Sequence, residues 1–229
     1  MNVFSVKKLM VSCVSITAMF LTTATIAQTS SHPNDPISMD EVSKINWLMS
    51  GPKLAARGVD ADKLSTITSN SQEVLLIERN KEKGAPKDQR RADVFIYDYS
   101  TNELIESLVD LYTSEVIHSE RKKGVQLPLT ENELKRAKEI VFEDEEERAI
   151  LEAEYKRITS TDLSDTAQLN IKAFIFHASS LPNRVNEASK QCGVHRCAQL
   201  MLYTQENIVF EISPIVNLSE SVVTQRIGF

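Results

Sequence analysis

One pattern, a helix followed by antiparallel strands, occurs twice in this sequence and constrains the fold more than any other feature. Each copy begins with a capping box, in which a Ser or Thr stands three residues before a Glu. The boxes are Ser38 with Glu41 and Thr130 with Glu133. Apolar residues at helical spacing follow each box, and stretches that alternate apolar and polar residues come next. The sequence therefore predicts an α+β fold of two tandem domains, each with a helix packed on an antiparallel β-meander.

The same patterns predict where the individual elements lie. In the first copy, the helix runs from the first capping box to Gly51-Pro52, and its Trp47 is expected in the core. Strands are predicted there at 73–79, 91–97, 103–111 and 115–118. In the second copy, a helix follows Thr130 and another covers 145–157. Its strands are predicted at 168–177, 197–203, 208–212, 215–218 and 222–227.

The two blocks of strands can be aligned with each other. Residues 91–97 correspond to 196–202, an offset of 105, and residues 109–111 correspond to 216–218, an offset of 107. The difference of two residues must lie in the turns. Such self-similarity indicates duplication of one unit, whereas the alternative is chance similarity between amphipathic hairpins.

The beginning of the chain has the features of an export signal. Lys7 and Lys8 precede residues 9–26, which contain no charge, and Thr25 and Ala27 supply small residues for a signal peptidase. We therefore predict cleavage after Ala27. The alternative is a retained membrane anchor, because the apolar run has about the length of a membrane span. Ser and Thr dilute that run, which favours cleavage.

Charge and cysteine content agree with export. The net charge is −6, and loss of Lys7 and Lys8 makes it more negative by two, so nucleic acid is an unsuitable partner. No later segment is long and apolar enough to span a membrane. We expect a periplasmic or secreted protein. Its predicted parts are a signal peptide at 1–27, a first domain at 28–125 and a second domain at 126–229.

Cys192 and Cys197 remain when Cys13 is removed with the signal. An even pair in an oxidising compartment predicts a disulfide, which would close a short loop before a strand. The alternative is a metal site, for example for Cu(I), formed by Cys192, His195 and Cys197. The spacing of the two cysteines does not match the Cys-x-x-Cys pattern of redox-active pairs.

Other polar features have two interpretations each. The acidic run Glu143–Glu147 could bind a cation or a basic partner, but it fits a solvated helix start, where negative charge meets the positive end of the helix dipole. His118 and His177 each end an apolar strand, where a single His is expected to be packed or solvated. No Gly-rich phosphate loop or Ser/His/Asp motif is present.

Several phrases, in this order, resemble a known family. They are His32-Pro33-Asn34-Asp35-Pro36-Ile37, Arg90-Arg91-Ala92-Asp93-Val94, Val109-Asp110-Leu111 and Pro128-Leu129-Thr130. Together they resemble the second and third, non-catalytic N-terminal domains of copper amine oxidases, without the catalytic domain. The resemblance implies α+β units of one helix on an antiparallel sheet, which hold neither copper nor the quinone cofactor. It therefore implies no cofactor.

The residues that perform the chemistry of this family are missing from the sequence. The family makes its quinone from the Tyr of an Asn-Tyr-Asp/Glu phrase, but Tyr97 follows Ile96, and Tyr203 precedes Thr204. The family holds copper with three His, two of them as His-x-His. The histidines here are single: His32, His118, His177 and His195. The resemblance thus implies that the chain is not an amine oxidase and has no catalytic residues.

These observations predict an exported, non-catalytic binding or accessory protein. Its partner would be a protein, such as a separately encoded oxidase, docked through the sheets or their edges. One alternative is a copper-handling protein that uses the Cys192–Cys197 loop. Another is an uncharacterised enzyme with a site between the two domains, and a third is a relic of a larger oxidase. Fold resemblance does not decide among these functions.

Overall fold

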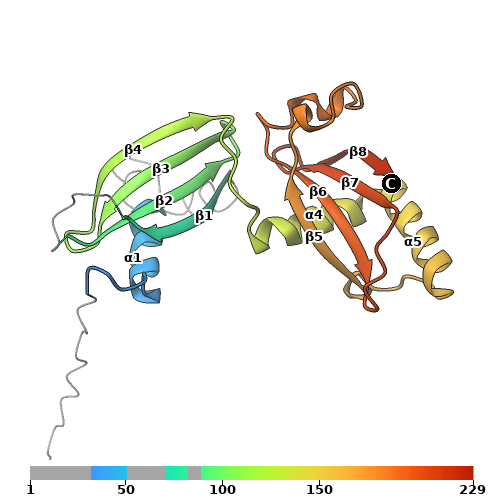
Figure 1. The fold of residues 1–229 in the computed structure, drawn as a ribbon, viewed down its shortest axis with the longest axis horizontal. Helices are drawn as coiled ribbons and strands as arrows, with labels where there is room; N and C mark the ends of the chain where they lie inside the picture. Colours follow the sequence, from blue (N-terminus) through green and yellow to red (C-terminus); the bar gives the residue numbers. More distant parts are fainter. Residues whose placement is uncertain (1–31, 51–70, 82–88, 229) are drawn as a thin grey trace, which may run out of the picture. The chain divides into compact units, whose positions relative to one another are not determined.

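A computed structural model describes residues 32–50, 71–81 and 89–228 of the chain. The predicted signal peptide at 1–27 and the helix stop at Gly51-Pro52 lie outside the described residues. Three α-helices and two four-stranded antiparallel sheets make up the described part (Figure 1). The predicted α+β class, with a helix packed on a β-meander in tandem, is confirmed.

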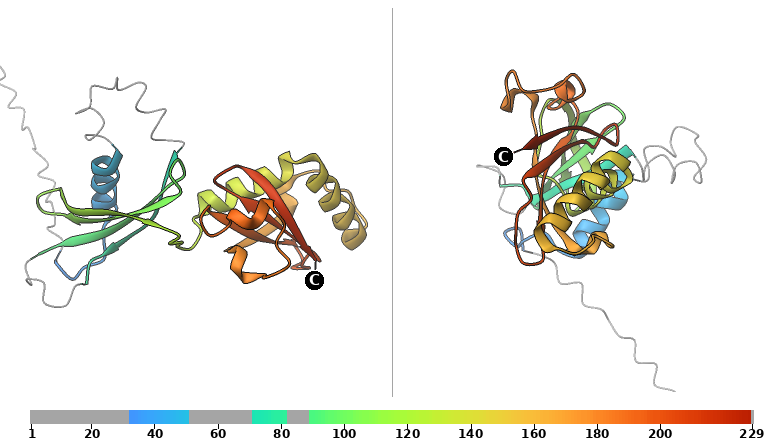
Figure 2. Two further views of the ribbon diagram at one scale, coloured as in Figure 1. Left: turned by 90° about the horizontal axis from the view of Figure 1, so that it is seen from above. Right: turned by 90° about the vertical axis from the view of Figure 1, so that its right-hand side faces the viewer.

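The described residues of the first half, within 32–124, form a meander with one helix. Helix α1 (Met39–Ser50) lies on one face of the sheet (Figures 1 and 2). The strands pair in chain order and are β1 (Gln72–Arg79), β2 (Arg91–Asp98), β3 (Glu103–Asp110) and β4 (Glu115–Lys123). Alternate residues of the sheet meet Ile45 of the helix, and the buried ones are Ala92, Val94, Ile96 and Val109.

The second half, residues 125–228, repeats the plan with a second helix and a long excursion. Helices α4 (Glu131–Glu143) and α5 (Glu145–Thr159) cover one face of the sheet (Figures 1 and 2). The strands again pair in chain order: β5 (Leu169–Ile175), β6 (Cys197–Thr204), β7 (Ile212–Asn217) and β8 (Val222–Gly228). Three short 3₁₀ turns are η1 (Thr166–Gln168), η2 (Ala178–Ser180) and η3 (Ala188–Gln191). The excursion at 176–196 packs a smaller core on the opposite face of the sheet, made of Phe176, Cys192, Cys197 and Ile215.

The two halves share irregular features at matching positions. The pairing of the third and fourth strands shifts between Leu108 and Val109 in the first sheet and between Ile215 and Val216 in the second. The turns that follow contain Ser114 at φ 57° and Ser221 at φ 56°. Each of these pairs is separated by the predicted offset of 107. The repeat is therefore confirmed as structural similarity at the end of the two strand blocks.

At the start of the blocks, the predicted offset of 105 is wrong by one residue. Arg90, and not Arg91, corresponds to Arg196, because each directly precedes the second strand of its sheet. Val94 then matches Leu200, and both are buried on the helix-covered face of their sheets. A slip of one residue would turn every side chain to the opposite face, so burial decides the register.

Two further expectations are wrong. Trp47 is 68% exposed, since it lies two residues from the buried Ile45 and therefore about 200° away around the helix. The run 208–212 was expected to form a strand, but only Ile212 joins one. Val209 forms an isolated bridge to Tyr203, and the Phe210 N–H donates to the Leu202 carbonyl as Phe210 turns into the core.

Candidate functional site

Among the described residues, each half buries one arginine beneath the segment that leads into its first helix. In the second half, the side chains of Arg196 and Glu133 are both 0% exposed. Arg196 donates from Nε and Nη2 to the two carboxylate oxygens of Glu133, the second at 2.8 Å. It also donates to the carbonyls of Leu127 and Pro128, each at 3.0 Å. One guanidinium thus joins the helix start, the strand and the preceding segment.

The first half repeats this arrangement with Arg90 and Glu41. Arg90 Nε lies 2.5 Å from Glu41 Oε1, and Nη2 lies 2.8 Å from Oε2. The guanidinium also donates to the carbonyls of His32 at 2.8 Å, Asp35 at 2.9 Å and Pro36 at 2.9 Å. These carbonyls belong to the phrase that opens the family resemblance. The phrase is therefore held by backbone contacts to one buried arginine.

The buried carboxylates remain ionised. The hydrogen bonds from Arg90 lower the pKa of Glu41 to about 2, and those same bonds raise the pKa of Arg90. Burial alone would raise the pKa of Glu133, but the hydrogen bonds and charge of Arg196 outweigh burial and lower it. A carboxylate held ionised by a two-point ion pair suits a scaffold and not proton transfer near neutral pH.

The two cysteines that were predicted to form a disulfide lie in a loop of the second half, and this loop contacts the first half. Cys192 and Cys197 form a disulfide, with 5.4 Å between their Cα atoms. The Val194 carbonyl inside this loop accepts from the Tyr97 hydroxyl at 3.2 Å. The neighbouring Gly193 carbonyl accepts from the side chain of Gln126 at 3.3 Å. The loop therefore contacts the first half through Tyr97 and the start of the second half through Gln126, a role that sequence reasoning missed.

His195 points toward the turn after β7. Its Nδ1 lies 3.1 Å from Asn217 Nδ2 and 3.4 Å from a carboxylate oxygen of Glu220. Within the described ranges, no group of three or more His, Cys, Asp or Glu side chains is placed to hold a metal ion. In the disulfide state shown, neither cysteine offers the thiolate that the metal hypothesis requires.

Two tyrosines of the first half contact the charged residues of the second. The Tyr99 hydroxyl donates to Glu133, and the Arg136 guanidinium lies 4.6 Å from the centre of the Tyr99 ring. The rings of Tyr97 and Tyr99 meet edge to face at 4.9 Å, and Arg196 lies 5.4 Å from the Tyr97 ring. Burial, then the charge of Glu133, raises the pKa of Tyr99, so its hydroxyl stays a donor.

The two histidines that were predicted to end strands, His118 and His177, lie in different surroundings. His118 is exposed in β4, opposite Leu108. His177 packs against Gly193, whose φ is +110°, and a Cβ added to this glycine would lie 2.9 Å from His177 Nδ1. The loop therefore requires glycine at that point.

The acidic run differs in part from expectation. Asp144 caps helix α5, where its side chain accepts from the N–H groups of Glu146 and Glu147 at 3.0 Å. Glu147 is buried and not solvated, and it pairs with Arg226 Nε of β8 at 2.6 Å. Burial raises the pKa of Glu147, although Arg226 opposes that shift. The run thus starts a helix, as one interpretation predicted, and also ties that helix to the sheet.

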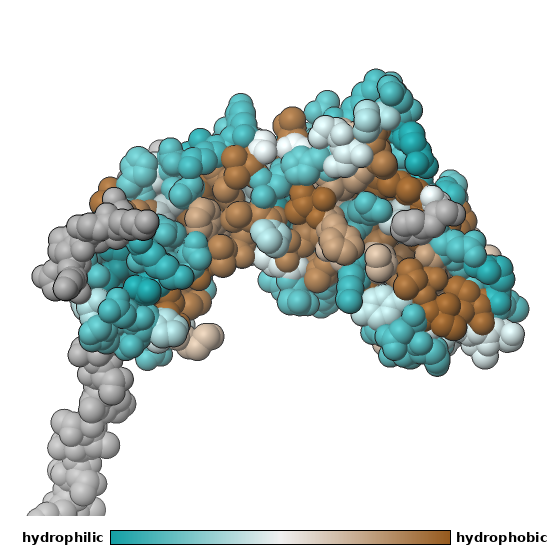
Figure 3. All heavy atoms as spheres, viewed as in Figure 1, coloured by the Kyte–Doolittle hydropathy of each residue, from teal (hydrophilic) through white to brown (hydrophobic). Residues whose placement is uncertain are grey.

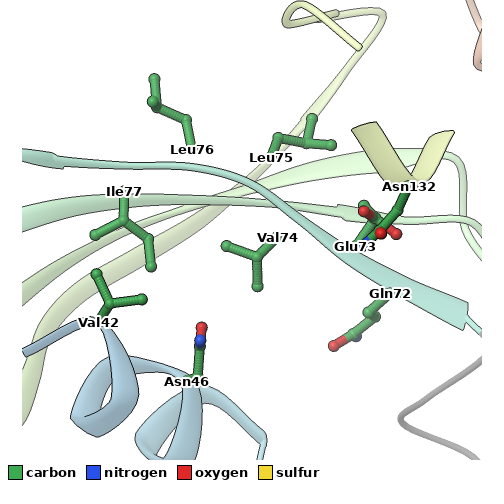
Figure 4. Close-up of a pocket in the computed structure, with 9 residues that line it drawn as sticks. All are labelled: Val42, Asn46, Gln72, Glu73, Val74, Leu75, Leu76, Ile77 and Asn132. Atoms are coloured by element: carbon green, nitrogen blue, oxygen red, sulfur yellow. The ribbon is translucent and has the colours of Figure 1, made fainter. Parts of the chain in front are cut away.

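An open groove of about 590 Å³ lies between α1 and strand β1. Val74 and Ile77 point toward Val42 and Asn46 of the helix, whereas Leu76 points away from it (Figure 4). Among the described residues that line the groove, Glu73 is the ionisable one, and its carboxylate accepts from Thr130 Oγ1 at 2.8 Å. The described lining consists mainly of aliphatic and amide side chains, and its carboxylate is already engaged by Thr130.

A second apolar surface lies on the face of the second sheet that α4 and α5 leave uncovered. Phe174 of β5 is 56% exposed, and Met201 and Tyr203 of β6 share its face. Val209 pairs with Tyr203 at the end of this face and is also exposed. Figure 3 has the viewpoint of Figure 1, in which this sheet lies in front of α4. Hydrophobic residues are visible at the surface in this view, among hydrophilic ones. This surface was not among the sites predicted from sequence.

No helix among the described residues has both the length and the apolar character needed to cross a membrane. No family model matches the sequence, and no curated protein matches it. Among solved structures, the fold is similar to that of a copper-containing benzylamine oxidase from Hansenula polymorpha, with a TM-score of 0.51 and 15% sequence identity. The match covers 87% of this chain and 30% of that one. The similarity concerns the fold, and this chain spans less than a third of the oxidase.

Proposed function

We propose that the chain is an exported, non-catalytic binding protein that docks a protein partner, such as a separately encoded oxidase. In this proposal, residues 28–125 and 126–229 are two domains that resemble the second and third N-terminal domains of copper amine oxidases. The fold similarity to part of the benzylamine oxidase supports the resemblance. The Cys192–Cys197 disulfide supports export, because such bonds persist in oxidising compartments.

The observation that carries the proposal is the uncovered face of the second sheet. Its Phe174 and Val209 side chains are exposed beside Met201 and Tyr203. Apolar side chains that gather on a surface mark sites of protein contact, and aromatic residues contribute strongly to such interfaces. The opposite face of the same sheet is already filled by α4 and α5. The part of this face that neither the helices nor the excursion at 176–196 covers is thus the part that a partner could still bury.

The buried ion pairs support a scaffold role. Glu41 and Glu133 are each bound at both oxygens by an arginine that also holds the segment before the helix. These pairs fix the entrance of each half without placing a reactive group at the surface. A rigid scaffold that presents a preformed apolar surface lowers the entropy cost of binding.

A capture experiment with matched variants tests the function. The wild type, Phe174→Ser and Tyr112→Ser would be expressed with an affinity tag in the native host and purified under mild conditions. Tyr112 lies in the β3–β4 turn and is also 56% exposed, which makes it a matched control. We expect one protein to copurify in a fixed ratio with the wild type and Tyr112→Ser, and to be lost with Phe174→Ser. Equal recovery by all three forms, or recovery by none, would refute docking through this face.

A further inference from the structure

The outer edges of the two sheets differ in regularity. Three of the four edge strands in the described part contain a bulge: β1 at Leu75, β4 at Ile117 and β8 at Thr224. Bulges bend an edge and hinder the addition of another strand. Strand β5 has none, and its seven residues pair without a break from Leu169↔Thr204 to Ile175↔Ala198. It is therefore the edge best shaped to accept a further strand.

The outward backbone groups of β5 are available for pairing. Phe176 N–H donates to the Cys197 carbonyl, so by antiparallel alternation Phe174 and Lys172 also face β6. The N–H and C=O groups that point outward then belong to Leu169, Ile171, Ala173 and Ile175. The Leu169 carbonyl accepts from Lys138 Nζ at 2.7 Å, and no described residue pairs with the outward groups of the other three.

The side chains of β5 indicate what kind of strand fits. Phe174 and Lys172 both lie exposed on the uncovered face, and the Lys172 ammonium lies 6.0 Å from the centre of the Tyr203 ring. In the antiparallel register with the longest overlap, a second copy of β5 would place Lys172 against Lys172. Like charges directly opposite each other destabilise a sheet, whereas opposite charges stabilise it. The edge therefore favours a different chain that carries an acidic residue.

We propose that β5 is the docking edge, and that the partner adds an extended segment to it with an acidic side chain opposite Lys172 and an apolar one beside Phe174. This inference rests on the proposed function and specifies how the partner binds. Main-chain hydrogen bonds to Ile171, Ala173 and Ile175 supply affinity, and the alternate side chains supply specificity. The docked segment continues the apolar surface that Phe174 begins.

Two synthetic peptides test the edge directly on the purified exported protein. Both have nine residues that alternate valine and threonine and begin with valine, and the central valine is replaced by glutamate in one and by lysine in the other, so that a valine lies beside Phe174. Wild type should bind the glutamate peptide about fivefold more tightly by fluorescence anisotropy. Hydrogen exchange at Ile171, Ala173 and Ile175 should slow in that complex. Lys172→Glu should reverse the preference, and Lys123→Glu, a lysine on the bulged edge strand β4, should leave it unchanged.

The results that would overturn strand addition differ from those that would overturn the proposed function. Equal affinity for the two peptides, no binding, or protection on another edge would overturn the inference. A concentration-dependent dimer that protects the same β5 amides without peptide would also overturn it, in favour of self-pairing. If Phe174→Ser abolishes capture of the natural partner while the β5 amides in the captured complex exchange freely, the proposed function stands and strand addition is wrong. If the peptides behave as expected but no partner depends on Phe174, the proposed function fails independently.

Discussion

At the scale of single residues, Arg90 and Arg196 each bind a glutamate at a helix start and carbonyl groups of the segment before that helix. Arg196 and Glu133 are fully buried, and the guanidinium also binds the carbonyls of Leu127 and Pro128. A buried ion pair contributes little net stability compared with apolar residues, but removal of one partner strands a charge in the interior. Replacement of one partner should therefore lower the stability of the fold more than replacement of both.

Arg196→Met should lower the free energy of unfolding by about 3–5 kcal/mol, because it leaves the Glu133 carboxylate buried without its counter-charge. Urea unfolding followed by circular dichroism measures the loss. The double variant Arg196→Met/Glu133→Gln should recover part of it, since the stranded charge is gone while the bonds to Leu127 and Pro128 remain lost. A single-variant loss below about 1 kcal/mol would contradict this account.

Glu41 should make stability depend on acid. Its pKa is about 2 in the folded chain, held down by Arg90, against about 4.3 for an unfolded glutamate. The lowered pKa stabilises the fold above about pH 4.3, and this contribution disappears as the pH falls toward 2. The unfolding free energy should decline over that window, and the decline should be smaller in Glu41→Gln. Parallel curves for the two proteins between pH 5 and about 2 would refute the assignment.

At the scale of elements, the excursion between β5 and β6 packs the second face of its sheet at one end. Its disulfide loop follows η3, and Ser189 of that turn donates through its hydroxyl to Thr224 of β8 at 2.8 Å. The buried Phe176 and Ile215 complete the small core around Cys192 and Cys197. The loop is thus part of the packing of the second half and also the part of it that reaches Tyr97.

Removal of the disulfide by Cys192→Ala/Cys197→Ala should lower stability by about 2 kcal/mol, the value for closing so short a loop. Hydrogen exchange should quicken in the excursion and at the adjoining end of β6, while α5 changes little. Unfolding curves of the wild type with a dithiol reductant should approach those of the variant. Unchanged exchange in the loop would show that packing alone holds it.

At the scale of the whole molecule, the described contacts link the two halves through few residues. Tyr99 binds Glu133, and Tyr97 binds the Val194 carbonyl. Because Glu133 also pairs with Arg196, the contact from the first half meets the buried ion pair of the second. The stability of each half should therefore depend on the other.

Tyr99→Leu should uncouple the unfolding of the two halves. It removes a hydrogen bond to a buried charged group, worth about 1.5–3 kcal/mol, and the ring that lies under Arg136. The urea dependence of hydrogen exchange at Val94 and Leu200 reports on the two cores separately. The two profiles should coincide in the wild type and separate in the variant. Separate profiles already present in the wild type would refute the coupling.

Much of the fold follows from local patterns. The capping boxes at Ser38 and Thr130 were predictable because a three-residue spacing brings side chain and backbone together whatever the rest of the chain does. Strand positions followed from alternation for the same local reason. Val209 shows where this reasoning ends: a short apolar run could be a strand or a turn, and the burial of Phe210 decided for the turn.

The sequence by itself determined the helix starts, most strands and the repeat, since each depends on neighbours a few residues apart. Only the tertiary structure decided which distant residues bind each other. Arg90 pairs with Glu41, 49 positions away, and Arg196 pairs with Glu133, 63 positions away. The Tyr97 hydroxyl donates to the Val194 carbonyl, 97 positions away. The tertiary structure also decided which edge is regular, because bulges arise from the pairing of two strands. Such contacts depend on chain closure over long distances, and no short-range pattern in the sequence records them.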